Sequence, residues 1–258
     1  MSNFVPTPDQ RIAGQTAIVT GATSGLGRHF SQLLAREGCR VALVGRRENR
    51  LAEVETEIVR AGGECLSLTL DLEDPAAIAD ALVRIEQDFD AASILINNAA
   101  FPGLGYATRV PLETLDRVFA TNLRAPFLLA SGVARRLIAL GAPGRIVNIS
   151  SMSATHFTGR GDALYSITKA GLDRMTEVLS VEWARFHINV NSIAPGSFES
   201  EMTEEAILAD RESFEGRFPR RRIGSTAHLD STLLYLLDPR SEFVTGTIIK
   251  VDDGQFPR

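Results

Sequence analysis

Short apolar runs alternate with amphipathic segments along most of the chain. The apolar runs lack a regular alternation of polar and apolar positions, which is the pattern of strands that a parallel sheet buries on both faces. We predict strands at residues 16–20, 41–44, 65–70, 93–96, 145–149, 188–193 and 247–251.

The segments between these runs have the spacing and the end signals of helices. Asp74-Pro75 combines a capping residue with a proline in the first turn. Pro126 is expected to bend the long segment in which it lies. Residues 201–218 are polar, charged and only weakly periodic. The expected helices cover residues 26–37, 51–61, a segment that begins at residue 74, 112–139 as one or two helices, 163–186 and 227–237.

This order of strands and helices predicts βαβ units with right-handed crossovers. The expected fold class is α/β, with a single Rossmann-like doubly wound parallel sheet and helices on both of its faces. No linker, repeat or low-complexity segment divides the chain. We therefore expect one domain over residues 12–258, preceded by an N-terminal arm at residues 1–11.

The composition excludes several classes of protein. The chain has 258 residues and 44% of them are hydrophobic, which is too apolar for a disordered protein. Its net charge of −5 disfavours a strongly basic nucleic-acid binder. No apolar stretch approaches the ~18 residues of a membrane span, and the first residues lack a secretory signal. Cys39 and Cys65 cannot form a disulfide scaffold. We expect a cytoplasmic protein that binds neither nucleic acid nor a membrane.

A glycine-rich turn, Thr20-Gly21-Ala22-Thr23-Ser24-Gly25-Leu26-Gly27, follows the first expected strand. Glycines permit a tight turn and a close approach of the backbone to a ligand, and the N-terminus of the next helix suits a pyrophosphate. The spacing TGxxxGxG is neither GxGxxG nor a Walker loop. The glycines could serve packing alone, but their place after the first strand favours a dinucleotide.

The second expected strand ends in Gly45-Arg46-Arg47. An NAD enzyme usually has an acidic residue here that accepts from the ribose 2′-OH. A glycine followed by two guanidinium groups instead favours the 2′-phosphate of NADP(H). A solvated basic start of the next helix is the alternative. Asp71-Leu72 follows the third strand, where an adenine would lie, although Asp71 equally fits a turn that leads into a helix.

Tyr165 and Lys169 lie four residues apart, on one face of an expected helix. Only Lys169 and Lys250 are lysines among the 27 basic residues, so a lysine at this position stands out. A cation beside a phenol lowers the pKa of the phenol, and such a tyrosine can exchange a proton with an alcohol oxygen. Ser151 follows the fifth strand and can hydrogen-bond a substrate oxygen; a plain Ser/Thr-rich turn is the alternative.

Together with Asn97-Asn98-Ala99, Asn122 and Pro195-Gly196, these motifs resemble the short-chain dehydrogenase/reductase family in order and interval over about residues 12–254. Within that family the chain is similar to 3-oxoacyl-acyl-carrier-protein reductases and gluconate 5-dehydrogenases, including Phe243-Val244-Thr245-Gly246 near its end.

The resemblance implies a role for each site residue. Tyr165 would be the general acid or base, Lys169 would hold the nicotinamide ribose and lower the Tyr165 pKa, Ser151 would polarise the carbonyl, and Asn122 would anchor a water in the proton relay. Asn98, Ala99 and Ala100 would line the adenosine side, and Pro195, Gly196, Phe198 and Ser200 the nicotinamide. The complete expected cofactor set is Gly21, Thr23, Ser24, Gly25, Leu26, Gly27, Arg46, Arg47, Asp71, Leu72, Asn98, Ala99, Ala100, Tyr165, Lys169, Pro195, Gly196, Phe198 and Ser200.

Three positions depart from the family pattern. Ala100 replaces the usual final glycine after Asn97-Asn98-Ala99, and Asp253 stands where glycine is common. The interval from Ser151 to Tyr165 is about one residue longer than is usual in the family, which leaves Ser153 as an alternative to Ser151.

Other polar residues are less informative. The four histidines lack metal-ligand spacing, so no metal site is expected, although His156 could contact a substrate. Arg217 and the run Arg220-Arg221-Arg222 fit a solvated face, or a contact with a polyanionic substrate such as an acyl-carrier protein. Trp183 fits packing or a subunit contact.

The function expected from the sequence is an NADP(H)-dependent oxidoreductase that interconverts a secondary alcohol and a ketone. The alternatives are the same chemistry with NAD(H), and a non-catalytic dinucleotide-binding sensor. The resemblance implies a homotetramer paired through residues 112–139 and 163–186, and residues 197–222 are expected to form a substrate lid. Apart from its being a small molecule with a carbonyl or an alcohol, the substrate is not readable from the sequence.

Overall fold

The computed structural model describes residues 11–157, 159 and 161–255; ten of the eleven residues of the expected arm, 1–10, lie outside the described residues. Seven parallel strands form one sheet in the order β3-β2-β1-β4-β5-β6-β7. Their bounds are β1 (Thr16–Thr20), β2 (Arg40–Gly45), β3 (Glu64–Thr69), β4 (Ile94–Asn97), β5 (Gly144–Ile149), β6 (Ile188–Pro195) and β7 (Ile248–Val251).

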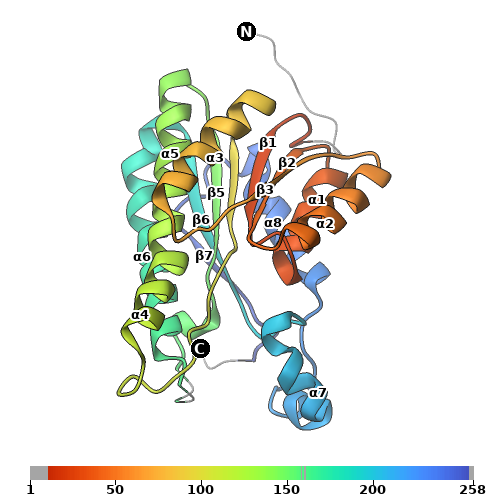
Figure 1. Ribbon diagram of the computed structural model, residues 1–258, viewed down its shortest axis with the longest axis vertical. Helices are drawn as coiled ribbons and strands as arrows, with labels where there is room; N and C mark the ends of the chain where they lie inside the picture. Colours follow the sequence, from red (N-terminus) through yellow and green to blue (C-terminus); the bar gives the residue numbers. More distant parts are fainter. Residues whose placement is uncertain (1–10, 158, 160, 256–258) are drawn as a thin grey trace.

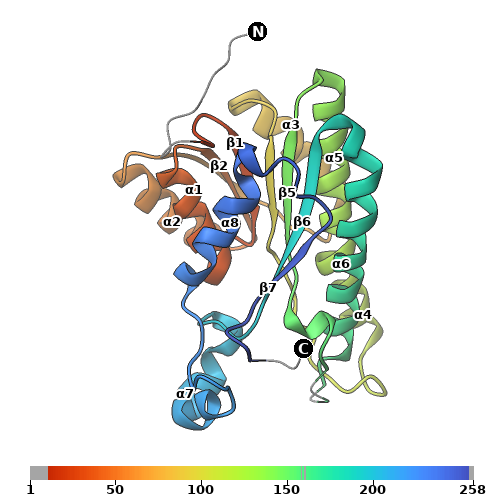
Figure 2. The ribbon, with the colours of Figure 1, turned by 180° about the vertical axis from the view of Figure 1, so that it is seen from behind.

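Helices cover both faces of the sheet. Figures 1 and 2 show α1, α2 and α8 on one face and α3, α5 and α6 on the other. The bounds are α1 (Gly25–Arg36), α2 (Glu48–Arg60), α3 (Pro75–Asp88), α4 (Leu112–Phe119), α5 (Ala125–Leu140), α6 (Ala163–Trp183), α7 (Glu201–Gly216) and α8 (Asp230–Leu237). The expected α/β fold class, a doubly wound parallel sheet, is confirmed.

The sheet is buried between two apolar layers because its central strands carry apolar side chains on both faces. Val19 of β1 packs with Phe30 and Leu34 of α1, while Ile18 of the same strand packs in the opposite layer. Trp183 is 6% exposed and belongs to that second layer, so within the chain it has the packing role that was one of its two expected roles.

The long segment around Pro126 forms two helices joined by a wider turn. α4 leads through a π-helical turn, η1 (Ala120–Arg124), into α5, and Pro126 lies in the first turn of α5. Proline has no N–H, so it cannot donate the usual hydrogen bond to the carbonyl of Asn122. The expected bend is thus accommodated as a π turn, and Asn122 lies within it.

The polar segment that follows β6 folds into α7, which has a kink at Asp210 (φ −166°, ψ 91°). Ser200 caps its N-terminus in a reciprocal arrangement with Thr203. Figure 1 shows α7 beyond the ends of the strands, apart from the two helical layers. This position leaves α7 facing the carboxyl edge of the sheet.

β1 and β4 are neighbours in the centre of the sheet. From β1 the successive strands are added toward one edge, and from β4 they are added toward the other. In an open parallel sheet, the carboxyl ends of the strands at such a point form a crevice that binds ligands. Thr20 links the two strand ends, because its Oγ1 accepts hydrogen bonds from the backbone N–H groups of Asn98 (3.0 Å) and Ala99 (3.0 Å).

Candidate active site

A cleft of about 660 Å³ opens at the carboxyl edge of the sheet. Every residue of the cofactor set expected from the sequence lines it except Gly27. Ser151, Tyr165 and Lys169 lie in the same cleft, whereas Asn122 is not among the described residues that line it. Tertiary folding therefore brings the end of β1, the end of β2, β5 and α6 to one cavity.

The glycine-rich turn has backbone positions that a larger residue would disturb. Gly25 has φ +51°, in the left-handed region. A Cβ on Gly27 would lie 2.1 Å from the carbonyl oxygen of Gly21, so Gly27 permits α1 to pack closely against the turn. Gly21 is equally confined, since its Cβ would lie 2.8 Å from Nδ2 of Asn98. Gly27 thus shapes the cradle without facing the cleft, and the backbone around it fits a pyrophosphate at the start of α1.

Tyr165 and Lys169 project from the first turns of α6 toward the end of β5. The Lys169 side chain is 2% exposed. Its Nζ donates to the carbonyl oxygen of Ile149 (2.6 Å) and lies 5.5 Å from the centre of the Tyr165 ring. Burial lowers the pKa of Lys169 to about 8, and the nearby carboxylate of Asp173 opposes that shift.

Burial raises the pKa of Tyr165 to about 12, and a hydrogen bond from Ser151 partly opposes this. This direction is opposite to the one expected from the neighbouring lysine alone. The loss of phenolate hydration on burial outweighs the stabilisation of the phenolate by neighbouring groups. Ser151 is the serine that bonds the Tyr165 hydroxyl; the backbone N–H of Ser153 donates to Ser151 Oγ (3.1 Å). This geometry favours Ser151 over Ser153 as the partner of Tyr165.

Asn122 holds two parts of the site together. Its Oδ1 accepts from the backbone N–H of Phe101 (2.7 Å), and its Nδ2 donates to the carbonyl oxygen of Phe101 (3.0 Å) and to Thr168 Oγ1 (3.1 Å). Thr168 immediately precedes Lys169. Asn122 therefore positions the loop after β4 against α6, and its side chain is committed to these contacts.

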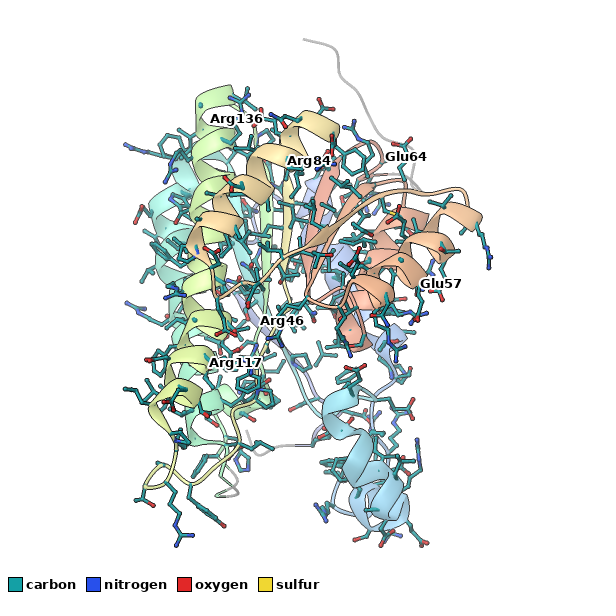
Figure 3. The ribbon with its side chains drawn as sticks, viewed as in Figure 1. Arg46, Glu57, Glu64, Arg84, Arg117 and Arg136 are labelled. Atoms are coloured by element: carbon teal, nitrogen blue, oxygen red, sulfur yellow. The ribbon has the colours of Figure 1, made fainter. Side chains whose placement is uncertain are left out.

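The two arginines after β2 point to different partners. Arg46 Nη1 lies 3.8 Å from the Glu73 carboxylate, which Arg117 also contacts at 3.0 Å, and Figure 3 shows Arg46 and Arg117 close together. Arg47 turns to the glycine-rich turn, where its Nη2 donates to Thr23 Oγ1 (2.9 Å) and Ser24 Oγ (2.9 Å). Both arginines line the cleft, and neither is a solitary solvated charge.

Several other residues singled out in the sequence also have definite places. Asp71 lines the cleft and its Oδ1 accepts from the backbone N–H of Glu73 (3.0 Å), so it also forms the turn that leads toward α3. His156 is not among the described lining residues. Arg220 and Arg222 form ion pairs with Asp253, one of the departures from the family pattern, at 2.9 and 2.6 Å.

The structure brings to the site several residues that the sequence reasoning did not assign to it, among them Glu201, Thr203 and Asp173. Glu201 and Thr203 of α7 line the cleft, and Asp173 lies one turn beyond Lys169 on α6. Asp173 Oδ1 accepts from Ser192 Oγ (3.1 Å). The i, i+4 spacing from Lys169 to Asp173 was readable, but no sequence pattern links Glu201 to a turn 177 positions away.

Comparison with known proteins points to one family. A family model described as short chain dehydrogenase matches residues 15–210. The gluconate 5-dehydrogenase of Gluconobacter oxydans is 34% identical over 251 residues, covering 94% of this chain and 95% of its own. The 3-oxoacyl-(acyl-carrier-protein) reductase of Aquifex aeolicus is 33% identical, with 95% of this chain and 99% of its own covered.

Solved structures agree in fold. A putative 2-deoxy-D-gluconate 3-dehydrogenase from Agrobacterium tumefaciens, described with bound NADP, has a TM-score of 0.87 at 32% identity and covers 98% of this chain and 100% of its own. A putative gluconate dehydrogenase from the same organism has a TM-score of 0.90 at 29% identity, with 96% and 98% covered. Within the part of the chain that the structure describes, no helix is long and apolar enough to cross a membrane. With its parallel sheet, its cleft at the strand ends and these relatives, the chain belongs to the short-chain dehydrogenase/reductase family and is an oxidoreductase that acts on CH–OH groups.

Proposed function

We propose that the protein interconverts a secondary alcohol and a ketone with NADP(H), using Tyr165 as the general acid and base. The observation that carries this proposal is the grouping of Ser151, Tyr165 and Lys169 in the same cleft that the glycine-rich turn lines. A non-catalytic dinucleotide-binding sensor needs only the glycine-rich turn. The presence of Ser151, Tyr165 and Lys169, which could transfer a proton, therefore favours an enzyme.

The chain's residues would divide the work as follows. The cofactor supplies or accepts the hydride. Tyr165, with its raised pKa, is protonated at neutral pH and can donate its proton to the oxygen of a ketone. Ser151, already within hydrogen-bonding reach of that hydroxyl, orients the same oxygen. The Lys169 ammonium stabilises the phenolate that forms.

Arg46 and Arg47 support a preference for NADP(H). The end of β2 offers Gly45 and two guanidinium groups to the cleft, with no carboxylate of its own to accept from a ribose 2′-OH. A phosphate forms charge-assisted hydrogen bonds with guanidinium groups. Partial exposure of both side chains, 52% for Arg46 and 43% for Arg47, reduces the gain, so we expect about a tenfold preference.

The test is a steady-state comparison of NADPH with NADH on a panel of ketones and alcohols. Several relatives are named for sugar acids and polyols and others for 3-oxoacyl thioesters, so the panel begins with these classes. Wild-type kcat/KM should favour NADPH, and both Arg46→Ala and Arg47→Ala should reduce the ratio. A wild-type preference for NADH would refute the cofactor assignment.

We also propose that the protein assembles as a homotetramer with a small-molecule substrate in each subunit. α4, α5 and α6 carry large apolar side chains that are exposed in the single chain, at Leu112, Leu115, Phe127, Val178 and Val181. Exposed apolar residues gathered on neighbouring helices are typical of subunit interfaces.

A further inference from the structure

A carboxylate from α7 lies on the polar groups of the glycine-rich turn. Glu201, the first residue of α7, forms two hydrogen bonds with the Arg47 guanidinium, from Nη1 to Oε1 (3.0 Å) and from Nη2 to Oε2 (3.0 Å). Ser24 Oγ donates to the same Oε2 (2.9 Å). The contact joins residues 154 positions apart and lies at the wall of the cleft.

A phosphate could occupy the same site as the Glu201 carboxylate, because both anions bind the same donors. A planar guanidinium binds two oxygens of a carboxylate or of a phosphate in the same parallel manner. The donors of Ser24 and Arg47 converge on one point, where the Glu201 carboxylate accepts hydrogen bonds from both residues. The hydrogen bond from Arg47 is the main cause that lowers the pKa of Glu201, so the carboxylate is charged at neutral pH.

The position of Glu201 follows from local structure at the start of α7. Ser200 caps the helix, and Thr203 Oγ1 bonds back to the carbonyl oxygen of Phe198 (2.7 Å). Phe198 is 6% exposed and belongs to the core. Glu201 is therefore presented to the turn by an anchored helix start, although its own side chain is 48% exposed and can leave Arg47.

We infer that Glu201 is a residue that sets cofactor specificity: it competes with the 2′-phosphate of NADP(H) for Arg47 and Ser24. The inference rests on the proposed placement of that phosphate at Arg47. A cofactor with a 2′-phosphate must displace the Glu201 carboxylate, whereas one with a 2′-hydroxyl leaves Arg47 paired. Glu201 thus reduces the preference in affinity for NADP(H) over NAD(H) that the arginines would otherwise create.

Two ligands that differ only in the 2′-phosphate isolate this effect without turnover. Isothermal titration calorimetry at low ionic strength would measure the dissociation constants of 5′-AMP and adenosine 2′,5′-bisphosphate for the wild type, Glu201→Gln and Glu199→Gln. Glu199 is the matched control, because it lies two positions away, pairs with Arg211 (2.8 Å) and is 51% exposed. Its substitution removes the same charge and leaves the Arg47 contact.

In Glu201→Gln, the preference for the bisphosphate over 5′-AMP should rise about two- to fivefold, which is the change in affinity that the loss of an exposed ion pair produces. In Glu199→Gln it should equal that of the wild type. An unchanged or reduced preference in Glu201→Gln overturns the inference. So does an equal rise in both variants, which would show a general charge effect.

This outcome is separable from that of the proposed function. If the wild type favours NADPH in turnover and Glu201→Gln shows no increased preference for the bisphosphate, the cofactor assignment stands and the competition is disproved. If Glu201→Gln shows an increased preference for the bisphosphate while the wild type favours NADH in turnover, the competition is established and the cofactor assignment fails.

Discussion

At the scale of single residues, burial decides the protonation of Tyr165 and Lys169, the proposed proton-transfer pair. The cleft keeps the Tyr165 phenol protonated by raising its pKa to about 12 and brings the Lys169 pKa down to about 8. Both shifts favour the neutral form of a group that is removed from water. The protonated phenol is the form that the proposed donation of a proton to a ketone oxygen requires.

Replacing Tyr165 with phenylalanine should remove turnover and keep cofactor binding. In the proposed mechanism only the phenol oxygen supplies the proton, and loss of such general acid–base help costs ~10²–10⁴-fold in rate. Single-turnover kinetics and NADPH titration of Tyr165→Phe would measure both. Tyr235→Phe is the control, because Tyr235 lies on α8 and is 49% exposed. Near wild-type kcat in Tyr165→Phe would exclude the assignment.

The Lys169 pKa predicts how ketone reduction depends on pH. The ammonium is charged below its pKa of about 8, so the rate should decline as pH rises through that value. The groups that face it are Asp173, Tyr165 and the carbonyl oxygen of Ile149.

Because the Asp173 carboxylate raises the Lys169 pKa, Asp173→Asn should move the decline to lower pH. Glu177→Gln is the control, since Glu177 pairs with Arg174 on the same helix. A pH–rate profile of kcat that is the same in the wild type and both variants would contradict this electrostatic effect of Asp173 on Lys169.

At the scale of elements, the turn between β1 and α1 depends on backbone contact. A methyl group on Gly27 would collide with the carbonyl oxygen of Gly21 at 2.1 Å, so Gly27→Ala must displace α1 or the turn. We expect a loss of about 1–3 kcal/mol in unfolding free energy, equivalent to a fall in Tm of several degrees.

Thermal denaturation followed by circular dichroism would measure the change in Gly27→Ala. Gly216→Ala is its control, because no atom lies within 4 Å of the added methyl group at the end of α7. Equal Tm values for the two variants would show that the turn tolerates a side chain.

The segment 197–222 remains a proposed lid. It contains α7 with its kink at Asp210, and it meets the glycine-rich turn through Glu201. We expect its amide hydrogens to exchange faster than those of α6 in the free protein and to slow when NADPH binds, because lids order over a bound ligand. Hydrogen exchange measured by mass spectrometry would test this, with α3 as an internal reference. Identical exchange with and without NADPH would indicate a fixed surface helix.

At the scale of the whole molecule, the proposed tetramer can be tested at the exposed apolar residues of α4, α5 and α6. Val181 on α6 is 79% exposed in the single chain, and an acidic residue there would bury an unpaired charge at an interface. Val181→Glu should therefore lower the mass measured by light scattering. Val59→Glu on α2, where Val59 is 57% exposed, should leave it unchanged. A wild-type protein that is monomeric at micromolar concentration would refute the assembly.

The sequence by itself determined the fold class, because the expected strands are runs of apolar residues whose burial on both faces permits few other arrangements. It also located the glycine-rich turn and the pair Tyr165 and Lys169, since these depend on local spacing. The bend at Pro126 followed from the missing N–H, although its form as a π turn needed the structure.

Only the tertiary structure decided the electrostatics and the long-range partners of the site. Lysine beside tyrosine suggested a lowered phenol pKa, but the depth of burial sets the sign and is a property of the folded chain. Arg47 read as a free cation for a phosphate, yet folding brings it to Glu201, 154 positions away. Periodicity and spacing record neighbours along one element, whereas desolvation and ion pairing depend on which elements meet.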